Sequence, residues 1–129
     1  MIRLPFVFLV TLACGVFFPW WWPAVPGLLV GFWRHAHPAR GFFAAFLGGG
    51  AAWVAVAMWF DVRNDGLLSD RIAALFHLPD GTGLIAATAL VGGVTAGLGA
   101  LFGARFRLFW GSLQDALAEV AAPVPDDER

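Results

Sequence analysis

The sequence predicts an all-α fold, a membrane-embedded four-helix bundle with one short second span and interfacial amphipathic helices. The first observation is composition: 60% of the 129 residues are hydrophobic, 13% are charged and the mean hydropathy is +0.75. A soluble domain of this size is rarely so apolar. The second is that the apolar residues gather in four runs. The third is that every cationic residue is an arginine, most of them near the ends of those runs. Together these features favour a membrane protein.

The four apolar runs define the expected spans, at about residues 4–19, 20–37, 41–60 and 83–104. Only the last two reach the roughly 20 apolar residues that a bilayer span needs. Pro19 closes the first run. Pro23 and Pro26 fit the first turn of a second helix, where the backbone N–H groups have no partner within the helix. A tight break is therefore expected between the first two helices.

Three consecutive tryptophans lie in this break. A tryptophan ring prefers the headgroup level of a bilayer, where the ring is buried and its N–H contacts water. We expect Trp20, Trp21 and Trp22 to anchor the turn at one interface, and Trp33 to lie at the other. An aromatic cage for a cationic ligand is the less favoured interpretation, because adjacent rings splay apart.

The second run is the shortest. As a helix, residues 20–33 would rise about 21 Å, against a hydrocarbon core of about 30 Å. If the helix continues to Pro38, with Arg34 reaching the headgroups, it makes a short full span, which we favour. The alternative is a re-entrant hairpin, whose backbone must be covered by protein or water.

The arginines predict the orientation. Two arginines fall on one side of a four-span arrangement, Arg63 and Arg71, and five on the other, Arg3, Arg34, Arg40, Arg105 and Arg107. The side richer in arginine is the cytoplasmic one. We therefore expect a multi-pass protein with both termini in the cytoplasm.

Small residues recur every four positions in the third and fourth runs. Such ridges let helix backbones approach closely, which matters where lipid supplies no hydrophobic drive for association. The predicted helix-packing residues are Ala44, Gly48 and Ala52 on one helix, and Ala89, Gly93 and Gly97 on the other. We expect these two helices to cross closely within one chain. A homodimer across the spare face is the wider alternative.

Two segments are expected outside the bilayer core. Residues 69–78 follow a turn and carry an apolar face, which predicts a short helix on the outer interface. Residues 1–108 then form the transmembrane domain. Residues 109–129 form a cytoplasmic amphipathic segment, with a stripe at Phe109, Trp110, Leu113, Leu117 and Val120, and an acidic disordered tail.

No constellation in the sequence indicates chemistry. The four runs carry no ionisable group at membrane depth, which disfavours a coupled transporter. We expect no enzyme, catalytic residue, cofactor, metal site or nucleic-acid partner. His35 and His37 lack a third ligand nearby and fit solvated loop residues better than a metal site. The alternative function is a small oligomeric pore or carrier for a neutral or weakly polar solute, lined by Thr88, Thr95 and the glycines of the fourth run.

A pattern along about residues 4–107 resembles a group of small uncharacterised bacterial four-helix integral membrane proteins. It runs "FFPWWW…GFW…GFFAAFLGG…W…D…LLSDRIAALFHLP…ATALVGGVTAGLGAL". The resemblance implies the architecture and a bacterial inner membrane, but no activity. We therefore expect a structural or accessory subunit whose partners are the lipid bilayer and either a second copy or a larger membrane complex.

Overall fold

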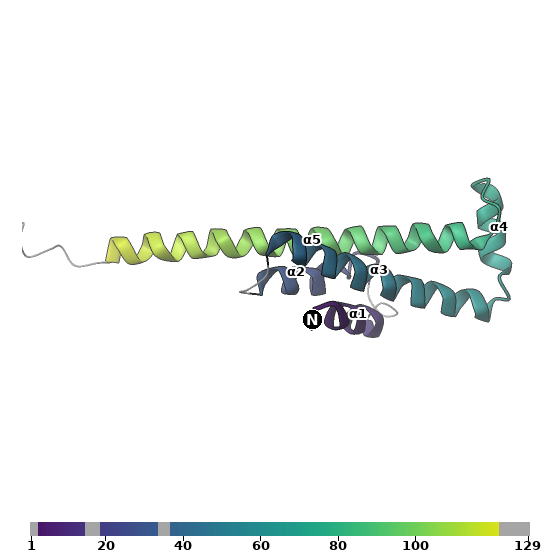
Figure 1. Ribbon diagram of the computed structural model, residues 1–129, viewed down its shortest axis with the longest axis horizontal. Helices are drawn as coiled ribbons and strands as arrows, with labels where there is room; N and C mark the ends of the chain where they lie inside the picture. Colours follow the sequence, from purple (N-terminus) through teal and green to yellow (C-terminus); the bar gives the residue numbers. More distant parts are fainter. Residues whose placement is uncertain (1–2, 15–18, 34–36, 122–129) are drawn as a thin grey trace, which may run out of the picture.

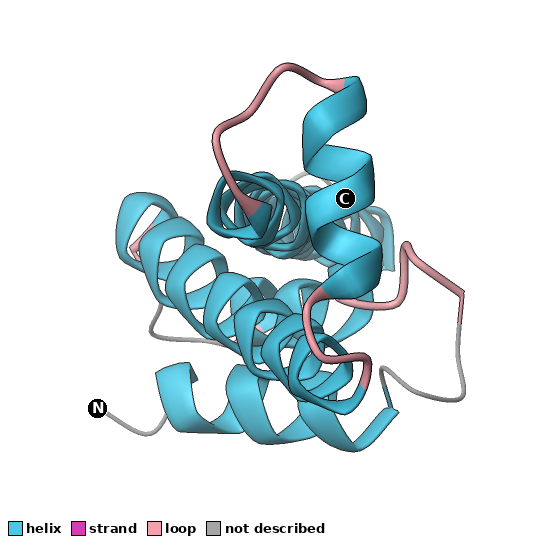
Figure 2. Ribbon diagram, turned by 90° about the vertical axis from the view of Figure 1, so that its right-hand side faces the viewer, coloured by secondary structure: helices cyan, strands magenta, loops and turns pink. Residues whose placement is uncertain are grey.

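The computed structural model describes residues 3–14, 19–33 and 37–121, and these residues form five helices with no strand among them. The helices are α1 (Arg3–Cys14), α2 (Ala24–Phe32), α3 (Pro38–Arg63), α4 (Leu67–Leu75) and α5 (Gly81–Ala121). The longest is α5, along which α2 and α3 pack; α1 packs on α3, and α4 lies across the end where α3 stops and α5 starts (Figure 1). Figure 2, viewed from that end, shows α4 in front of the other helices.

Among the described residues, two helices are long and apolar enough to cross a bilayer, α3 with 26 residues and α5 with 41. In each, 33% of the most apolar window is buried inside the chain, whereas the core helix of a soluble protein is mostly buried. At 1.5 Å per residue they rise about 39 and about 62 Å. The all-helical prediction is confirmed, and these two helices contain the expected spans 41–60 and 83–104.

The second run forms a shorter helix than expected, because α2 has nine residues and rises about 14 Å, well below a hydrocarbon core of about 30 Å. The described part of α1 has 12 residues, and residues 15–18 of the expected span 4–19 lie outside the described residues. A helix over 20–37 is not observed. Pro19 to Pro23 form a turn of i to i+3 hydrogen bonds, α2 starts only after Pro23, and Trp33 is already extended, with ψ 125°. Arg34 to Ala36 lie outside the described residues.

The direction of each helix follows from its contacts. A Cβ at Gly48 of α3 would lie 2.9 Å from the Leu4 carbonyl oxygen, and Leu12 faces Ala55, further along α3, so α1 and α3 run the same way. Gly27 and Gly31 of α2 meet Ala96 and Ala100 of α5 in that order, so these two helices also run the same way. α3 and α5 run antiparallel (Figure 1).

The C-terminal part of α5 differs from expectation in one respect. Instead of a separate segment after Arg107, the helix continues without interruption to Ala121 and projects beyond α2 and α3 (Figure 1). Good helix formers explain this, since Leu113, Gln114, Ala116 and Leu117 outweigh the single Gly111. The acidic tail 122–129 lies outside the described residues.

Candidate functional site

The closest helix contact in the structure is between α2 and α5, and it is made of glycine. A Cβ at Gly27 or Gly31 would overlap the carbonyl oxygen of Ala96 or Ala100 on α5. The contact is reciprocal: a Cβ at Gly99 or Gly103 would overlap the carbonyl oxygen of Ala24 or Leu28 on α2. Both helices thus carry a Gly-x-x-x-Gly pair, and backbone touches backbone along the crossing.

The contact between α3 and α5 is built differently. Here the glycines of α5 receive aromatic rings, because a Cβ at Gly97 would lie 2.6 Å from the Phe42 ring and a Cβ at Gly92 would lie 2.5 Å from the Trp53 ring. The Cβ position on Gly93 lies 2.9 Å from the Phe46 carbonyl oxygen and 3.1 Å from the Phe46 ring, so backbone and ring both contribute there. Side chains, rather than backbone alone, therefore fill most of this interface.

The predicted packing residues are distributed over two interfaces. Gly93 and Gly97 face α3, and the Ala89 carbonyl oxygen lies 3.0 Å from the Cβ position on Gly50. Gly48 faces Leu4 and Val7 of α1 instead of α5. Ala52 is fully buried, and Ala44 is half-buried. Sequence reasoning counted Gly99 among the packing glycines of the fourth run but missed its pairing with Gly103 against α2, and it missed the pair Gly27/Gly31, although the four-residue spacing was a visible signal.

The tryptophans expected as interfacial anchors lie in and after the turn. Trp20 is 68% exposed and Trp21 is 49% exposed, Trp22 is half-buried, and Trp33 is exposed. The turn leads directly into Ala24, which meets Gly99, about 24 Å along α5 from Gly83. The turn thus lies beside the interior of the apolar part of α5. The interfacial anchoring of the tryptophans stays a prediction.

The other end of α2 is joined to α5 by a polar bond and by aromatic rings. The Arg107 guanidinium donates a hydrogen bond from Nη1 to the Trp33 carbonyl oxygen at 2.8 Å. One residue earlier on each of the two segments, the rings of Phe32 and Phe106 lie 6.4 Å apart. Phe106 also stacks with Phe102 and Trp110 along α5, with centroids 6.3 Å apart in each case. These contacts hold the C-terminal end of α2 against α5.

Polar side chains connect α3, α4 and α5 where α4 crosses. The Ser69 hydroxyl donates to the Asp61 carboxylate at the end of α3 and lies 3.1 Å from the Gly66 carbonyl oxygen. The Asp70 carboxylate accepts the backbone N–H of Gly81, the first residue of α5, at 3.1 Å. We call Asp61, Ser69, Asp70 and Gly81 the outer clasp. Gly81 must be small there, because a Cβ would lie 2.8 Å from the Ser69 Cβ.

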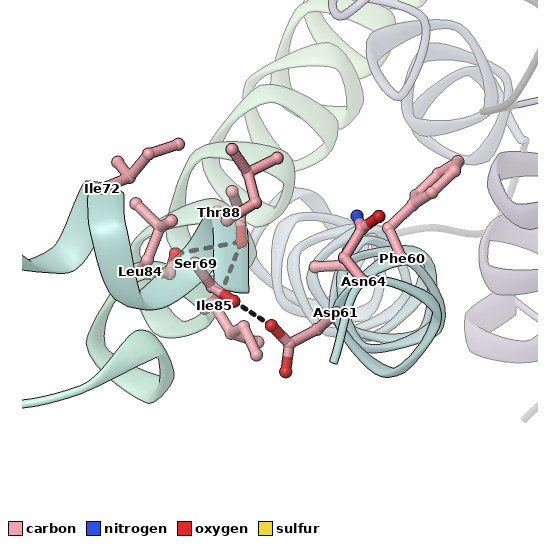
Figure 3. Close-up of a pocket in the computed structure, with 10 residues that line it drawn as sticks. Phe60, Asp61, Asn64, Ser69, Ile72, Leu84, Ile85 and Thr88 are labelled. Carbon is pink, nitrogen blue, oxygen red and sulfur yellow. Dashed lines mark hydrogen bonds between the residues drawn. The ribbon is translucent and has the colours of Figure 1, made fainter. Parts of the chain in front are cut away.

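A cavity of about 140 Å³ lies beside the outer clasp (Figure 3). Its polar lining consists of Asp61, Asn64, Ser69 and Thr88. The Thr88 hydroxyl donates back to the Leu84 and Ile85 carbonyl oxygens of its own helix, at 3.2 and 2.7 Å. The hydroxyls of this cavity are therefore engaged in structural hydrogen bonds, and no histidine is among the described lining residues to act as a base.

One titratable group at this end has a perturbed pKa. The side chain of Asp80 accepts hydrogen bonds from the hydroxyl and the backbone N–H of Thr82, the latter at 3.1 Å, in the first turn of α5. The Thr82 hydroxyl is the main cause that lowers the pKa of Asp80 below 3.8, and the backbone bonds act in the same direction. Asp80 is thus an N-cap of α5.

Within the described ranges 3–14, 19–33 and 37–121, no three His, Cys, Asp or Glu side chains gather closely enough to hold a metal ion. A comparison with known protein families finds no matching family model, and comparisons with curated proteins and with solved structures find no match.

Proposed function

We propose that this chain is a small integral membrane protein without enzymatic activity, a structural or accessory subunit that packs through α5 against a second copy or a larger membrane complex. The observation that carries the membrane part is the inverted distribution of side-chain size. The buried apolar side chains are small: Val7, Val30, Ala45, Ala52, Ala73, Ala96, Ala100 and Ala104. The large apolar side chains lie mostly outside.

This distribution is the reverse of that in a water-soluble domain, which buries Leu, Ile, Phe and Met first. Leu47, Trp59, Leu90, Leu98 and Phe102 are all exposed along α3 and α5. Contiguous apolar surface on that scale needs a lipid or protein environment. Helices packed by glycine and alanine, with large side chains facing outwards, are typical of association within lipid.

The packing part of the proposal is supported by the C-terminal part of α5. Beyond Arg107 this helix keeps a stripe about 100° wide of apolar side chains. We call it the arm stripe, and its residues are Phe109, Trp110, Leu113, Leu117 and Val120. All five are exposed, up to 86% at Val120. The stripe supports docking to another helix, because its spacing of three and four residues matches the seam of helix pairs.

The pore alternative gains no support from the described residues. The α5 glycines that would line a path, among them Gly93, Gly97 and Gly99, lie against α2 or α3 of the same chain. The Thr95 hydroxyl donates to the Val91 carbonyl oxygen at 2.7 Å. These glycines and this hydroxyl therefore make contacts within the chain instead of lining a path.

Site-specific cross-linking in native membranes tests the proposal. A photo-reactive residue at Leu117, within the arm stripe, should give several-fold more protein adduct than one at Asp115 on the opposite side of α5, and the adduct mass separates a second copy from another subunit. Retention in the membrane pellet after alkaline washing tests the embedding separately. Equal adducts at both positions would overturn the docking role, and release by the wash would overturn the embedding.

A further inference from the structure

An apolar groove lies between α1 and α3, near the end of α3 that meets α4. Its volume is about 560 Å³, and it is lined by Leu12 of α1 and by Ala55, Val56, Trp59, Phe60 and Arg63 of α3. The described part of α1 ends at Cys14, and α3 continues to Arg63. The larger side chains at the open end, Trp59 and Phe60, are 62% and 50% exposed. The groove is therefore apolar along its length and open at one side.

Arg63 is the one charged side chain among the described residues that line this groove, and it lies at one end. The Arg63 guanidinium lies over the Trp59 ring, 5.1 Å from its centroid. Among the described residues Arg63 forms no ion pair, and of the two acids that lie two residues away in sequence, Asp61 and Asp65, the first accepts a hydrogen bond from Ser69. The pair thus offers a positioned cation with free N–H donors beside a ring that favours the headgroup level.

We propose that this groove binds one anionic phospholipid, with an acyl chain lying along α3 and the headgroup phosphate at Arg63. An acyl chain matches the lining of Leu12, Val56 and Phe60, and a guanidinium matches a phosphate because two N–H donors meet two oxygens. The inference rests on the membrane embedding proposed above, since only a lipid environment presents such a chain to the groove.

Two observations favour a lipid over the described helices of this chain. The described part of α1 ends at Cys14, and α5 occupies a different side of α3, where Phe42, Phe46 and Trp53 meet its glycines. A basic residue at the end of an apolar groove between helices is the arrangement that recognises anionic headgroups. Ala55 is the smallest of the described lining residues, which leaves room for a methylene chain beside it.

Native mass spectrometry of the purified full chain tests the proposal. The probes are a phosphatidylglycerol and a phosphatidylcholine with identical acyl chains, added separately at equal concentration. We expect the anionic lipid to form about fivefold more one-to-one adduct, the ratio that one arginine contributes to headgroup binding. Arg63→Gln should remove this preference, and Arg71→Gln, which changes an arginine of α4 at the same end, should keep it.

A second pair of variants tests the acyl-chain part. Ala55→Phe should reduce adducts of both lipids several-fold by filling the groove, whereas Ala87→Phe, the same change on an exposed position of α5, should leave both unchanged. The proposal is overturned by equal adducts of the two lipids in the unmodified chain, by a preference that survives Arg63→Gln, or by a protein dimer that forms in place of the lipid adduct. These outcomes leave the cross-linking result at Leu117 untouched, so failure of the lipid site and failure of the proposed function are distinguishable.

Discussion

α5 uses its small residues in two ways, against α2 and against α3, and the two crossings differ in what fills them. Against α2, Gly99 and Gly103 meet backbone carbonyl oxygens, and Gly27 and Gly31 of α2 do the same in return. Against α3, the glycines of α5 receive mainly aromatic rings. A ring can turn or shift by a few tenths of an ångström, but a helix backbone moves only as a whole. The same residue type therefore tolerates change very differently at the two places.

The largest effect should come from the backbone-to-backbone crossing. Gly31→Ala puts a methyl group onto the Ala100 carbonyl oxygen, so the two helices must separate along their whole contact. We expect a loss of about 3 kcal/mol in the free energy of unfolding, the upper end for overpacking, measured by denaturant titration in mild detergent.

Gly111→Ala is the matched control for that variant. Nothing lies within 4 Å of the Cβ position on Gly111, which is inside α5 but beyond the bundle. Alanine is the better helix former there, so the change should stabilise by about 0.5–1 kcal/mol. Equal effects of the Gly31 and Gly111 substitutions would show that α2 is not packed against α5 as described.

A smaller effect is expected at the ring-filled crossing. Gly97→Ala meets the outer edge of the Phe42 ring, which can move, and alanine gains helix propensity. The net loss should be about 1 kcal/mol. Adding Phe42→Leu should reduce the cost of Gly97→Ala in a double-mutant cycle, because the ring that must move is gone. No coupling between the two positions would mean that the ring does not fill this interface.

This contrast also marks how far the sequence alone could lead. The apolar runs predicted α3 and α5, because each run is long enough for its hydropathy alone to indicate a helix that can span a bilayer. Four-residue spacing identifies a small-residue face of a helix, but it does not say which helix meets that face. Gly48 was therefore assigned to the contact with α5 and lies against α1, while Gly27 and Gly31 were not assigned at all.

The first two helices show a second limit. The length of α2 depends on where the turn after Pro19 ends, and hydropathy does not report this because Trp20, Trp21 and Trp22 suit a turn and a helix equally well. The outer clasp was also beyond sequence reasoning. The pattern predicts a short helix over 69–78, and the structure has it at Leu67–Leu75, but the bond of Ser69 to Asp61 of α3 depends on the angle at which α4 returns.

The hydrogen bond from Arg107 to the residue after α2 gives a third test of the comparison between the two crossings, with a smaller expected effect. Arg107→Gln removes the donor to the Trp33 carbonyl oxygen but leaves the glycine contacts intact. The expected loss is about 1 kcal/mol, since the bond is exposed to solvent and replaceable by water. Arg105→Gln is the control, because Arg105 has the same charge and is exposed, and no hydrogen bond of its side chain is among those of the described residues. Thermal unfolding of both variants at one salt concentration separates the bond from the charge.

The smallest effect concerns the start of α5, on the same helix as the ring-filled crossing, where Asp80 caps the helix. Hydrogen bonds from Thr82 lower the pKa of Asp80 below 3.8, so the folded state favours the carboxylate more than the unfolded state does. The stabilisation from this group is therefore complete well above pH 4 and is lost as the pH falls through the lowered pKa of the folded state.

Asp80→Asn keeps a side-chain oxygen that can accept from the Thr82 N–H but does not titrate. Melting temperatures of the two proteins should run parallel from pH 7 to about pH 5 and converge or cross below about pH 4, where only the unmodified chain loses its charged cap. The rest of the acid response, from the other carboxylates, is common to both and cancels in the difference. A difference that stays constant down to pH 3 would mean that Asp80 does not hold the first turn of α5 in its charged form.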